Sequence, residues 1–217
     1  MNKKRKTLIV GAGGHARVVA SLLMKQPDIE VVGVVDRTNQ HMGERVGNFY
    51  IVTSFDDLSL WYDRDIHYAA IALGNVQERA EAFATLKQIG FKVVSAIHRS
   101  SIIEDDVELG EGVTICAGVI LATQTKIGKN VLINTGTVID HESVIGDHSH
   151  VAPGCRIAGR VCIGERTFMG IGVTVKEKLR IGSRCTIGAG AVVLSSIPDD
   201  SIAYGVTASL RILKDHL

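Results

Sequence analysis

The sequence lacks the features that mark secreted, membrane-spanning and nucleic-acid-binding proteins. Its four cysteines show no C-x-x-C spacing, so we expect reduced packing residues rather than a disulfide framework or a zinc site. The basic start, MNKKRK, precedes only about half a dozen apolar residues, which is too few for a signal peptide or a membrane anchor. The net charge of +1 argues against a nucleic-acid partner. These absences predict a cytoplasmic protein without a membrane span.

What the sequence does have is a strict period of six in its second half. A large apolar residue falls at every sixth position, and the residue four places later is small or β-branched except at Leu179. A period of six is a multiple of the strand period of two and does not fit the helical 3.6, so we predict short strands stacked as a parallel solenoid. The large residues, all expected to point inward, are Ile97, Ile103, Leu109, Ile115, Leu121, Ile127, Ile133, Ile139, Ile145, Val151, Ile157, Ile163, Met169, Val175, Ile181, Ile187 and Val193.

Glycine often follows the large apolar residue of the repeat. We expect these glycines at corners of the solenoid, where the backbone is tight or left-handed. No inserted loop interrupts the period. The glycines concerned are Gly110, Gly128, Gly146, Gly164, Gly170, Gly182 and Gly188.

The first 96 residues follow a different pattern, in which short apolar runs alternate with amphipathic stretches. Apolar runs at 31–36, 50–54 and 67–74 are strand candidates, and the amphipathic stretches at 15–26 and 77–90 are helix candidates. Strands and helices taking turns indicate parallel βαβ units. We therefore predict an α/β domain over residues 1–96 and an all-β domain over residues 97–217.

A glycine-rich segment, Gly11-Ala12-Gly13-Gly14-His15-Ala16, directly follows the first predicted strand and opens the first helix. Asp36 ends the second strand. The placement fits G-x-G-x-x-A, in which glycines let the backbone approach a phosphate at a helix N-terminus. Taken alone, this motif indicates NAD, although the unit is short for a complete dinucleotide fold.

The combination of both halves resembles a known family. The runs IGKNVL, IGDHSH, IGERTF, IGSRCT and IGAGAV are similar to the hexapeptide repeat of left-handed parallel β-helix acyltransferases. Joined to the start VGAGGHA, they make the whole chain resemble the bacterial nucleotide-sugar N-acyltransferases of the sialic-acid O-acetyltransferase-like family. The resemblance implies a small Rossmann-like βαβ domain, then a left-handed β-helix with three hexads in each triangular coil.

In this family the small α/β domain holds the diphosphate of a nucleotide-linked sugar. The glycine turn lies near the phosphates, and the acidic residue after the second strand lies near the base or ribose. For His15 the alternative is a purely structural role as a helix cap. By resemblance, the nucleotide-sugar contacts are Gly13, Gly14, His15, Asp36, Arg37, Gly74 and Asn75.

Polar residues that interrupt the apolar repeat concentrate between residues 134 and 150. A carboxylate next to a histidine, as in His141-Glu142, stabilises the imidazolium and poises the ring for proton transfer near neutral pH. The family has such a pair, a second histidine nine residues after the first that contacts acetyl-CoA, and an asparagine upstream. The resemblance therefore implies that His141 is the general base and Glu142 orients it. It also implies that His150 binds the cofactor and Asn134 the substrate.

The same resemblance predicts the cofactor site and the reaction. Acetyl-CoA is expected along the C-terminal coils, between two subunits of a homotrimer, against the backbone of Gly170, Ile171, Gly188 and Ala189. The expected enzyme acetylates the C4 amine of a 4-amino-4,6-dideoxy sugar linked to UDP, GDP or dTDP, without an acyl-enzyme intermediate or a metal. The product is expected to enter surface polysaccharide or glycan synthesis.

Several alternatives stay open at this point. A sugar or sialic-acid O-acetyltransferase would have the same fold, with a hydroxyl in place of the amine as the acceptor. An NAD-dependent oxidoreductase would bind NAD at the glycine turn. The histidines His141, His148 and His150 are alternatively a metal site or surface residues without a role. A non-catalytic scaffold would bind neither ligand. Nothing around Asp36 selects one base over another.

Overall fold

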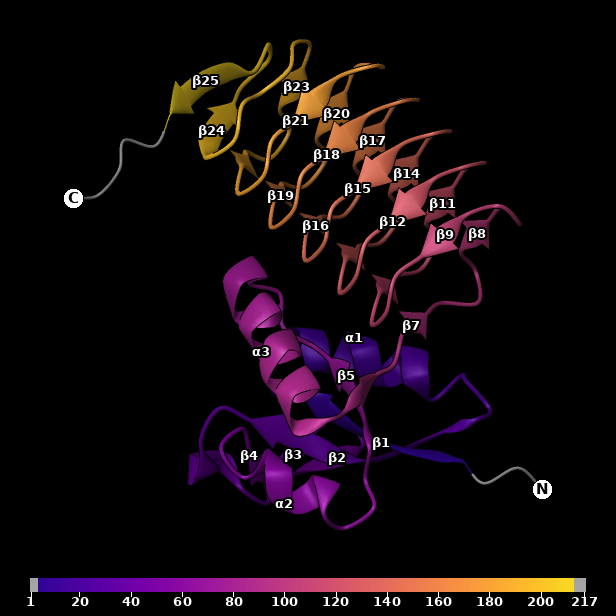
Figure 1. Cartoon of the computed structure of the whole chain (residues 1–217), viewed down its shortest axis with the longest axis vertical. Coiled ribbons are helices and arrows are strands. Elements are labelled where there is room, and N and C mark those ends of the chain that lie inside the picture. The colour runs from indigo at the N-terminus through magenta and orange to yellow at the C-terminus, as the bar shows by residue number, and fades with distance from the viewer. Residues whose placement is uncertain (1–3, 213–217) are drawn as a thin grey trace. The chain divides into compact units, whose positions relative to one another are not determined.

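The computed structural model describes residues 4–212, so the first three residues of the basic start and the last five residues of the chain lie outside the described part. The chain divides into two compact units, the first ending at Ile97 and the second beginning at His98 (Figure 1). The sequence pattern puts this division one residue earlier. The strand β1 already begins at Arg5, inside the basic start.

The N-terminal unit is a sheet with helices between its strands. The strand order is β3-β4-β2-β1-β5-β6, and all neighbours are parallel except the hairpin β3–β4. The chain moves outward from β1 to β4 and returns to β5 on the other side of β1, which makes a topological switch point between β1 and β5. The elements are β1 (Arg5–Val10), α1 (Gly14–Leu23), β2 (Ile29–Asp36), the 3-10 helix η1 (Asn39–His41), β3 (Arg45–Val46), β4 (Phe49–Ser54), α2 (Leu58–Tyr62), β5 (Tyr68–Ile71), α3 (Val76–Ile89), β6 (Lys92–Val93) and β7 (Ala96–Ile97).

Strand β1 lies at the centre of this unit because its apolar side chains are covered on both faces. Leu8, Ile9 and Val10 are at most 2% exposed. Ile9 packs in one cluster with Val19 and Leu23 of α1, whereas Leu8 and Val10 pack in another on the opposite face. The rigid strand therefore fixes the start of the glycine turn that follows it.

The C-terminal unit is a solenoid of two-residue strands, one for each hexad, stacked on three faces (Figure 1). Strands three hexads apart pair in parallel, as Leu132 with His150 and Val138 with Arg156, so each coil comprises three hexads. A hairpin of β24 and β25 ends the solenoid. The first face holds β10 (Thr114–Ile115), β13 (Leu132–Ile133), β16 (His150–Val151), β19 (Phe168–Met169), β22 (Thr186–Ile187), β24 (Ser201–Tyr204) and β25 (Ser209–Ile212). The second face holds β8 (Ile102–Ile103), β11 (Ile120–Leu121), β14 (Val138–Ile139), β17 (Arg156–Ile157), β20 (Thr174–Val175) and β23 (Val192–Val193). The third face holds β9 (Glu108–Leu109), β12 (Lys126–Ile127), β15 (Val144–Ile145), β18 (Cys162–Ile163) and β21 (Arg180–Ile181).

The predicted inward positions are buried from Ile115 to Val193, where each large apolar residue is at most 3% exposed. The expectation fails at Leu109, which is 37% exposed. Leu109 lies on β9, the first strand of its face, so only one neighbouring strand covers it. Leu109 is therefore open to solvent at this end of its face.

The seven glycines after the large residues are not the left-handed corners, which corrects the sequence expectation. The left-handed residues come two positions later, as Gly112 after Gly110, and include non-glycine residues such as Glu142 and Arg160. Gly110 is required by close approach, because a Cβ there would lie 2.6 Å from the backbone nitrogen of Lys129 in the next coil. Glycine at these sites lets successive coils stack.

Candidate active site

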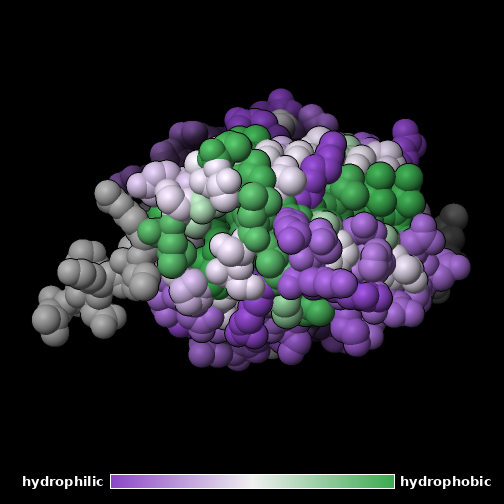
Figure 2. Space-filling model, turned by 90° about the horizontal axis from the view of Figure 1, so that it is seen from above, coloured by the Kyte–Doolittle hydropathy of each residue, from purple (hydrophilic) through white to green (hydrophobic). Residues whose placement is uncertain are grey.

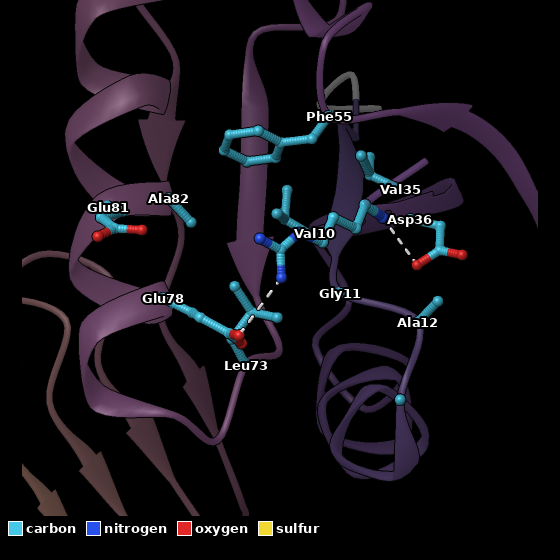
Figure 3. Close-up of a pocket in the computed structure, with 12 residues that line it drawn as sticks. Val10, Gly11, Ala12, Val35, Asp36, Phe55, Leu73, Glu78, Glu81 and Ala82 are labelled. Carbon is cyan, nitrogen blue, oxygen red and sulfur yellow. Dashed lines mark hydrogen bonds and ion pairs between the residues drawn. The ribbon is translucent and has the colours of Figure 1, made fainter. Parts of the chain in front are cut away.

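A pocket of about 300 Å³ opens in the N-terminal unit at the switch point between β1 and β5 (Figure 3). In open α/β sheets, ligands bind at this place, outside the carboxyl ends of the strands. Figure 3 shows Phe55 extending toward α3 and Asp36 on the far side from that helix. The lining residues are Val10, Gly11, Ala12, Gly13, Val35, Asp36, Arg37, Phe55, Leu73, Glu78, Glu81 and Ala82.

The glycines of the turn have two different roles. Gly11 has φ +114°, and a Cβ there would lie 2.8 Å from the carbonyl oxygen of Ala72, so the fold itself requires glycine. A Cβ on Gly13 or Gly14 would meet nothing within 4 Å. Helix α1 begins there with no side-chain hydrogen bond at its N-cap and no acidic residue in its first turn. Open space beside the backbone N–H groups of a helix start suits a phosphate.

Asp36 is held by two hydrogen bonds at the end of β2. One carboxylate oxygen accepts from the backbone nitrogen of Arg37 at 2.7 Å, and the other lies 2.7 Å from Nδ1 of His41. Asp36 and, to a smaller extent, Glu44 raise the pKa of His41. The carboxylate is therefore fixed in place at the rim of the pocket.

An ion pair crosses the pocket between the strand side and the helix side. The guanidinium of Arg37 lies 3.7 Å from the carboxylate of Glu78 on α3 (Figure 3). Both side chains are at least half exposed, so solvent screens the pair. A ligand that enters can therefore separate them at little cost.

His15 lies outside the pocket lining, in the first turn of α1. Burial, and then the charge of Arg79, lower the pKa of His15, so its ring is neutral at pH 7. Arg79 itself is 2% exposed, and burial lowers its pKa to about 10. Its Nη1 donates to the carbonyl oxygens of Leu73 and Gly74, at 3.4 and 3.3 Å. A buried cation thus fixes the loop after β5, beside the glycine turn.

Asn75 caps helix α3. Its Oδ1 accepts hydrogen bonds from the backbone nitrogens of Gln77 and Glu78, at 2.9 and 3.1 Å. The structure therefore places three predicted contacts on the pocket (Gly13, Asp36 and Arg37) and four outside its lining (Gly14, His15, Gly74 and Asn75).

Sequence reasoning missed Phe55, Glu78, Glu81 and the buried Arg79. Phe55 directly follows strand β4, and the carboxyl ends of parallel strands gather at one edge, so its place could have been found. The α3 residues carry no such signal, because a polar residue on an amphipathic helix usually faces solvent.

In the C-terminal unit, His141 and Glu142 lie at the corner that follows β14. Nδ1 of His141 is 2.9 Å from Oε2 of Glu142, and Nε of Arg160, from the next coil, donates to the same oxygen at 2.8 Å. Arg160 first, and His141 second, lower the pKa of Glu142. The carboxylate is thus ionised and held between an imidazole and a guanidinium.

The other predicted residues of the solenoid lie on another edge. Asn134, Gly170 and Gly188 each follow a strand of the first face, and Ile171 and Ala189 come next to the two glycines. His150 lies on β16 of that face, is 8% exposed and packs against Phe168 with ring centroids 5.1 Å apart. One chain does not bring these residues together with His141.

The three histidines of the metal alternative lie apart. His141 follows β14, His148 precedes β16 at a different corner, where its Nδ1 lies 2.9 Å from Nδ2 of Asn130, and His150 is on β16 itself. Over residues 4–212 no group of three or more histidine, cysteine, aspartate or glutamate side chains is arranged to hold a metal ion. None of the helices in this range is long and apolar enough to cross a bilayer.

Comparisons with known proteins match both units. The PglD N-terminal domain matches residues 6–86, and the bacterial transferase hexapeptide (six repeats) matches residues 124–159. Perosamine N-acetyltransferase from Caulobacter crescentus, solved as a variant with CoA and GDP-perosamine, is 33% identical over 95% of this chain and 96% of that chain, with a TM-score of 0.90. A search of curated proteins finds no match.

Two further solved structures are similar over nearly their whole length. The acetyltransferase domain of PglB from Neisseria gonorrhoeae FA1090, in complex with acetyl coenzyme A, is 27% identical over 95% of this chain and 98% of that chain, with a TM-score of 0.87. WeeI from Acinetobacter baumannii AYE is 28% identical over 95% and 99%, with a TM-score of 0.86.

These matches confirm the expected fold class, a Rossmann-like domain followed by a left-handed parallel β-helix. They also confirm the expected enzyme class and its acetyl-CoA co-substrate. The likeness to the Caulobacter enzyme covers almost all of both chains, well beyond one shared domain. The chain belongs to the nucleotide-sugar N-acetyltransferase family, which joins a PglD-type N-terminal domain to a hexapeptide-repeat β-helix.

Proposed function

We propose that this protein transfers the acetyl group of acetyl-CoA to the C4 amine of a 4-amino-4,6-dideoxy sugar linked to a nucleoside diphosphate. The observation that carries the proposal is the 2.9 Å contact between His141 and Glu142 in the solenoid. Such a pair is a general base in position to take a proton from an amine. The product would enter the synthesis of a surface polysaccharide or another glycan.

The N-terminal pocket is the proposed nucleotide site. Gly13 and Gly14 leave space beside the open N-terminus of α1, which supplies N–H donors for the diphosphate. Asp36, fixed at the rim, would accept hydrogen bonds from the ribose or base. The neutral ring of His15 can donate one hydrogen bond to the ligand without bringing a charge. The relative with 33% identity binds GDP-perosamine, which makes GDP the first nucleotide to test.

The proposed chemistry is a direct attack of the amine on the thioester. When Nδ1–H of His141 donates to Glu142, Nε2 keeps its lone pair and can accept a proton. The amine nitrogen bonds to the thioester carbon, Nε2 takes one N–H proton, and the tetrahedral adduct collapses as the C–S bond breaks. The CoA thiolate then leaves and is protonated. A backbone N–H stabilises the oxyanion.

The cofactor is proposed to lie along the edge formed by Gly170, Ile171, Gly188 and Ala189. Because this edge and His141 lie at different corners of the coil, the complete site needs a second subunit, and we propose a trimer. Large apolar side chains stay exposed on the single chain, among them Ile102 (56%) and Ile171 (61%). Figure 2, seen from the end where the solenoid finishes, also shows hydrophobic residues side by side.

The four cysteines are free thiols, three of them buried. Burial raises the pKa of Cys116 to about 11, so this thiol stays protonated and unreactive at neutral pH. We propose that the enzyme works in the cytoplasm, where thiols stay reduced.

The experiment measures thiol release from acetyl-CoA with GDP-, UDP- and dTDP-linked 4-amino sugars, and with the matching 4-hydroxy sugars as controls. We expect release with one of the amino sugars and none with its hydroxy analogue. His141→Asn keeps the size of the side chain and should lower kcat by at least about 100-fold while CoA still binds. Turnover at the wild-type rate in this variant would refute the assignment of the base.

A further inference from the structure

The coil after His141 holds two residues that no prediction from the sequence included. Arg160 lies one coil beyond Glu142 at the same left-handed corner, with φ +60° against +57°. Its backbone nitrogen donates to the carbonyl oxygen of His141 at 2.9 Å, and its side chain donates to Glu142. Gly159 precedes it and lies directly beside the His141 ring.

We propose that Arg160 and Gly159 position the general base: Arg160 fixes the Glu142 carboxylate that orients the ring, and Gly159, which has no side chain, leaves the space that the face of the ring occupies in this orientation. This inference rests on the proposed function, since it assigns roles around the same histidine.

The argument for Gly159 is steric. A Cβ on Gly159 would lie 2.5 Å from Nε2 of His141, 2.7 Å from Cε1 and 2.9 Å from Cδ2. The nearly equal distances place this Cβ over the face of the ring, so it would overlap the imidazole in its present orientation. Gly159 is not among the residues with positive φ, so alanine fits its backbone conformation. Any side chain here displaces the ring from its contact with Glu142, while the backbone of the coil stays in place.

The argument for Arg160 is electrostatic and geometric. Glu142 is 38% exposed and Arg160 54%, so each would have rotamer freedom without the other. The guanidinium fixes Oε2, and this oxygen in turn fixes the orientation of the imidazole. The other charged group on the turn is Asp140, whose Oδ1 accepts from the backbone nitrogen of His141 at 2.8 Å. In the preceding coil this corner holds Thr123 and Gln124, which carry no charge. In the coil beyond Arg160 it holds Lys178.

Without the guanidinium, the Glu142 side chain regains rotamer freedom, and the ring holds its productive orientation for a smaller fraction of the time. Arg160→Met should therefore lower kcat about tenfold with unchanged KM for acetyl-CoA. Arg160→Lys keeps a cation beside the carboxylate and should retain a kcat closer to the wild type.

The closing experiment compares Gly159→Ala, Arg160→Met and the matched control Arg166→Met, which removes an arginine from the next left-handed corner of the same coil. We expect Gly159→Ala to lower kcat at least about tenfold, with unchanged KM for acetyl-CoA and unchanged melting temperature. Arg160→Met should lower kcat about tenfold, also with unchanged KM, and Arg166→Met should leave kcat, KM and the melting temperature unchanged.

The outcomes separate this inference from the proposed function. Full kcat in Gly159→Ala, or in Arg160→Met, overturns the role of that residue while the wild-type activity stands. If the wild type acetylates no amino sugar, the proposed function itself fails. Loss of folding in Gly159→Ala, seen by circular dichroism, would also contradict the inference, since it predicts an intact coil.

Discussion

At the scale of single residues, the glycine turn contains one glycine that the fold requires and others that leave space for a ligand. Gly11→Ala should cost about 1–3 kcal/mol of unfolding free energy, because φ is +114° and the new Cβ meets backbone. Gly13→Ala should change stability by less than about 0.5 kcal/mol, since its Cβ meets nothing. Urea unfolding measures both values.

Gly13→Ala also tests the phosphate site. Gly13→Ala should weaken nucleotide diphosphate binding about tenfold or more in calorimetric titration, because its methyl group occupies the space left for the phosphate. Affinity for CoA, which binds the other unit in this proposal, serves as the control. Wild-type nucleotide affinity in Gly13→Ala would show that the diphosphate does not bind against the turn.

His15 predicts a dependence of stability on pH. Its pKa is lowered in the folded chain, by burial first and by Arg79 second, and returns to about 6.5 on unfolding. As the pH falls through 6.5, His15 therefore takes up a proton in the unfolded state before it does so in the folded state. The contribution of the neutral ring to the unfolding free energy is complete above pH 6.5 and is lost progressively as the pH falls toward the folded pKa. Unfolding free energies at pH 7.5 and 5 should differ less in His15→Gln than in the wild type.

One outcome of the same experiment would contradict this prediction. If His15→Gln keeps the difference in unfolding free energy that the wild type shows between the two pH values, burial of a neutral His15 is not its cause.

At the scale of secondary-structure elements, the solenoid depends on glycines that let coils stack. A Cβ on Gly146 would lie 2.5 Å from the backbone nitrogen of Glu165, so Gly146→Ala should cost about 1–3 kcal/mol and lower the melting temperature. Gly136 lies at a left-handed corner, with φ +68° and open space around it. Asparagine tolerates this conformation, so Gly136→Asn should cost less than about 1 kcal/mol. Equal losses of unfolding free energy in the two variants would contradict the distinction between glycines of close approach and glycines of left-handed corners.

The elements also show what the sequence could and could not predict. The period of six identified the strands because the inward positions from Ile115 to Val193 are local and repeat. The sequence placed the left-handed corners two residues too early. The glycines that follow the large apolar residues mark close approach between neighbouring coils, and a single hexad does not reveal that contact. Phe55 and Glu78 reach the pocket from separate elements, and only the folded sheet brings them together. Asn75 caps α3, a role that a polar residue before a helix commonly has, and its contact with the nucleotide stays a prediction.

At the scale of the whole molecule, the proposed trimer divides each active site between two subunits. His141 and the edge with Gly170 and Gly188 lie at different corners of the coil, so one active site in the proposed trimer takes its base from one subunit and its cofactor edge from another. This arrangement can be tested without a structure of the assembly, by subunit mixing.

We therefore expect two inactive variants to complement each other. His141→Ala lacks the base, and Gly170→Trp blocks the proposed cofactor edge, so each homotrimer should be inactive. After denaturation and refolding together in equal amounts, a site is intact when its base comes from one variant and its edge from the other, which gives about one quarter of the wild-type activity. Refolding each variant alone is the control. No recovery in the mixed, correctly assembled oligomer would show that base and cofactor edge belong to the same subunit.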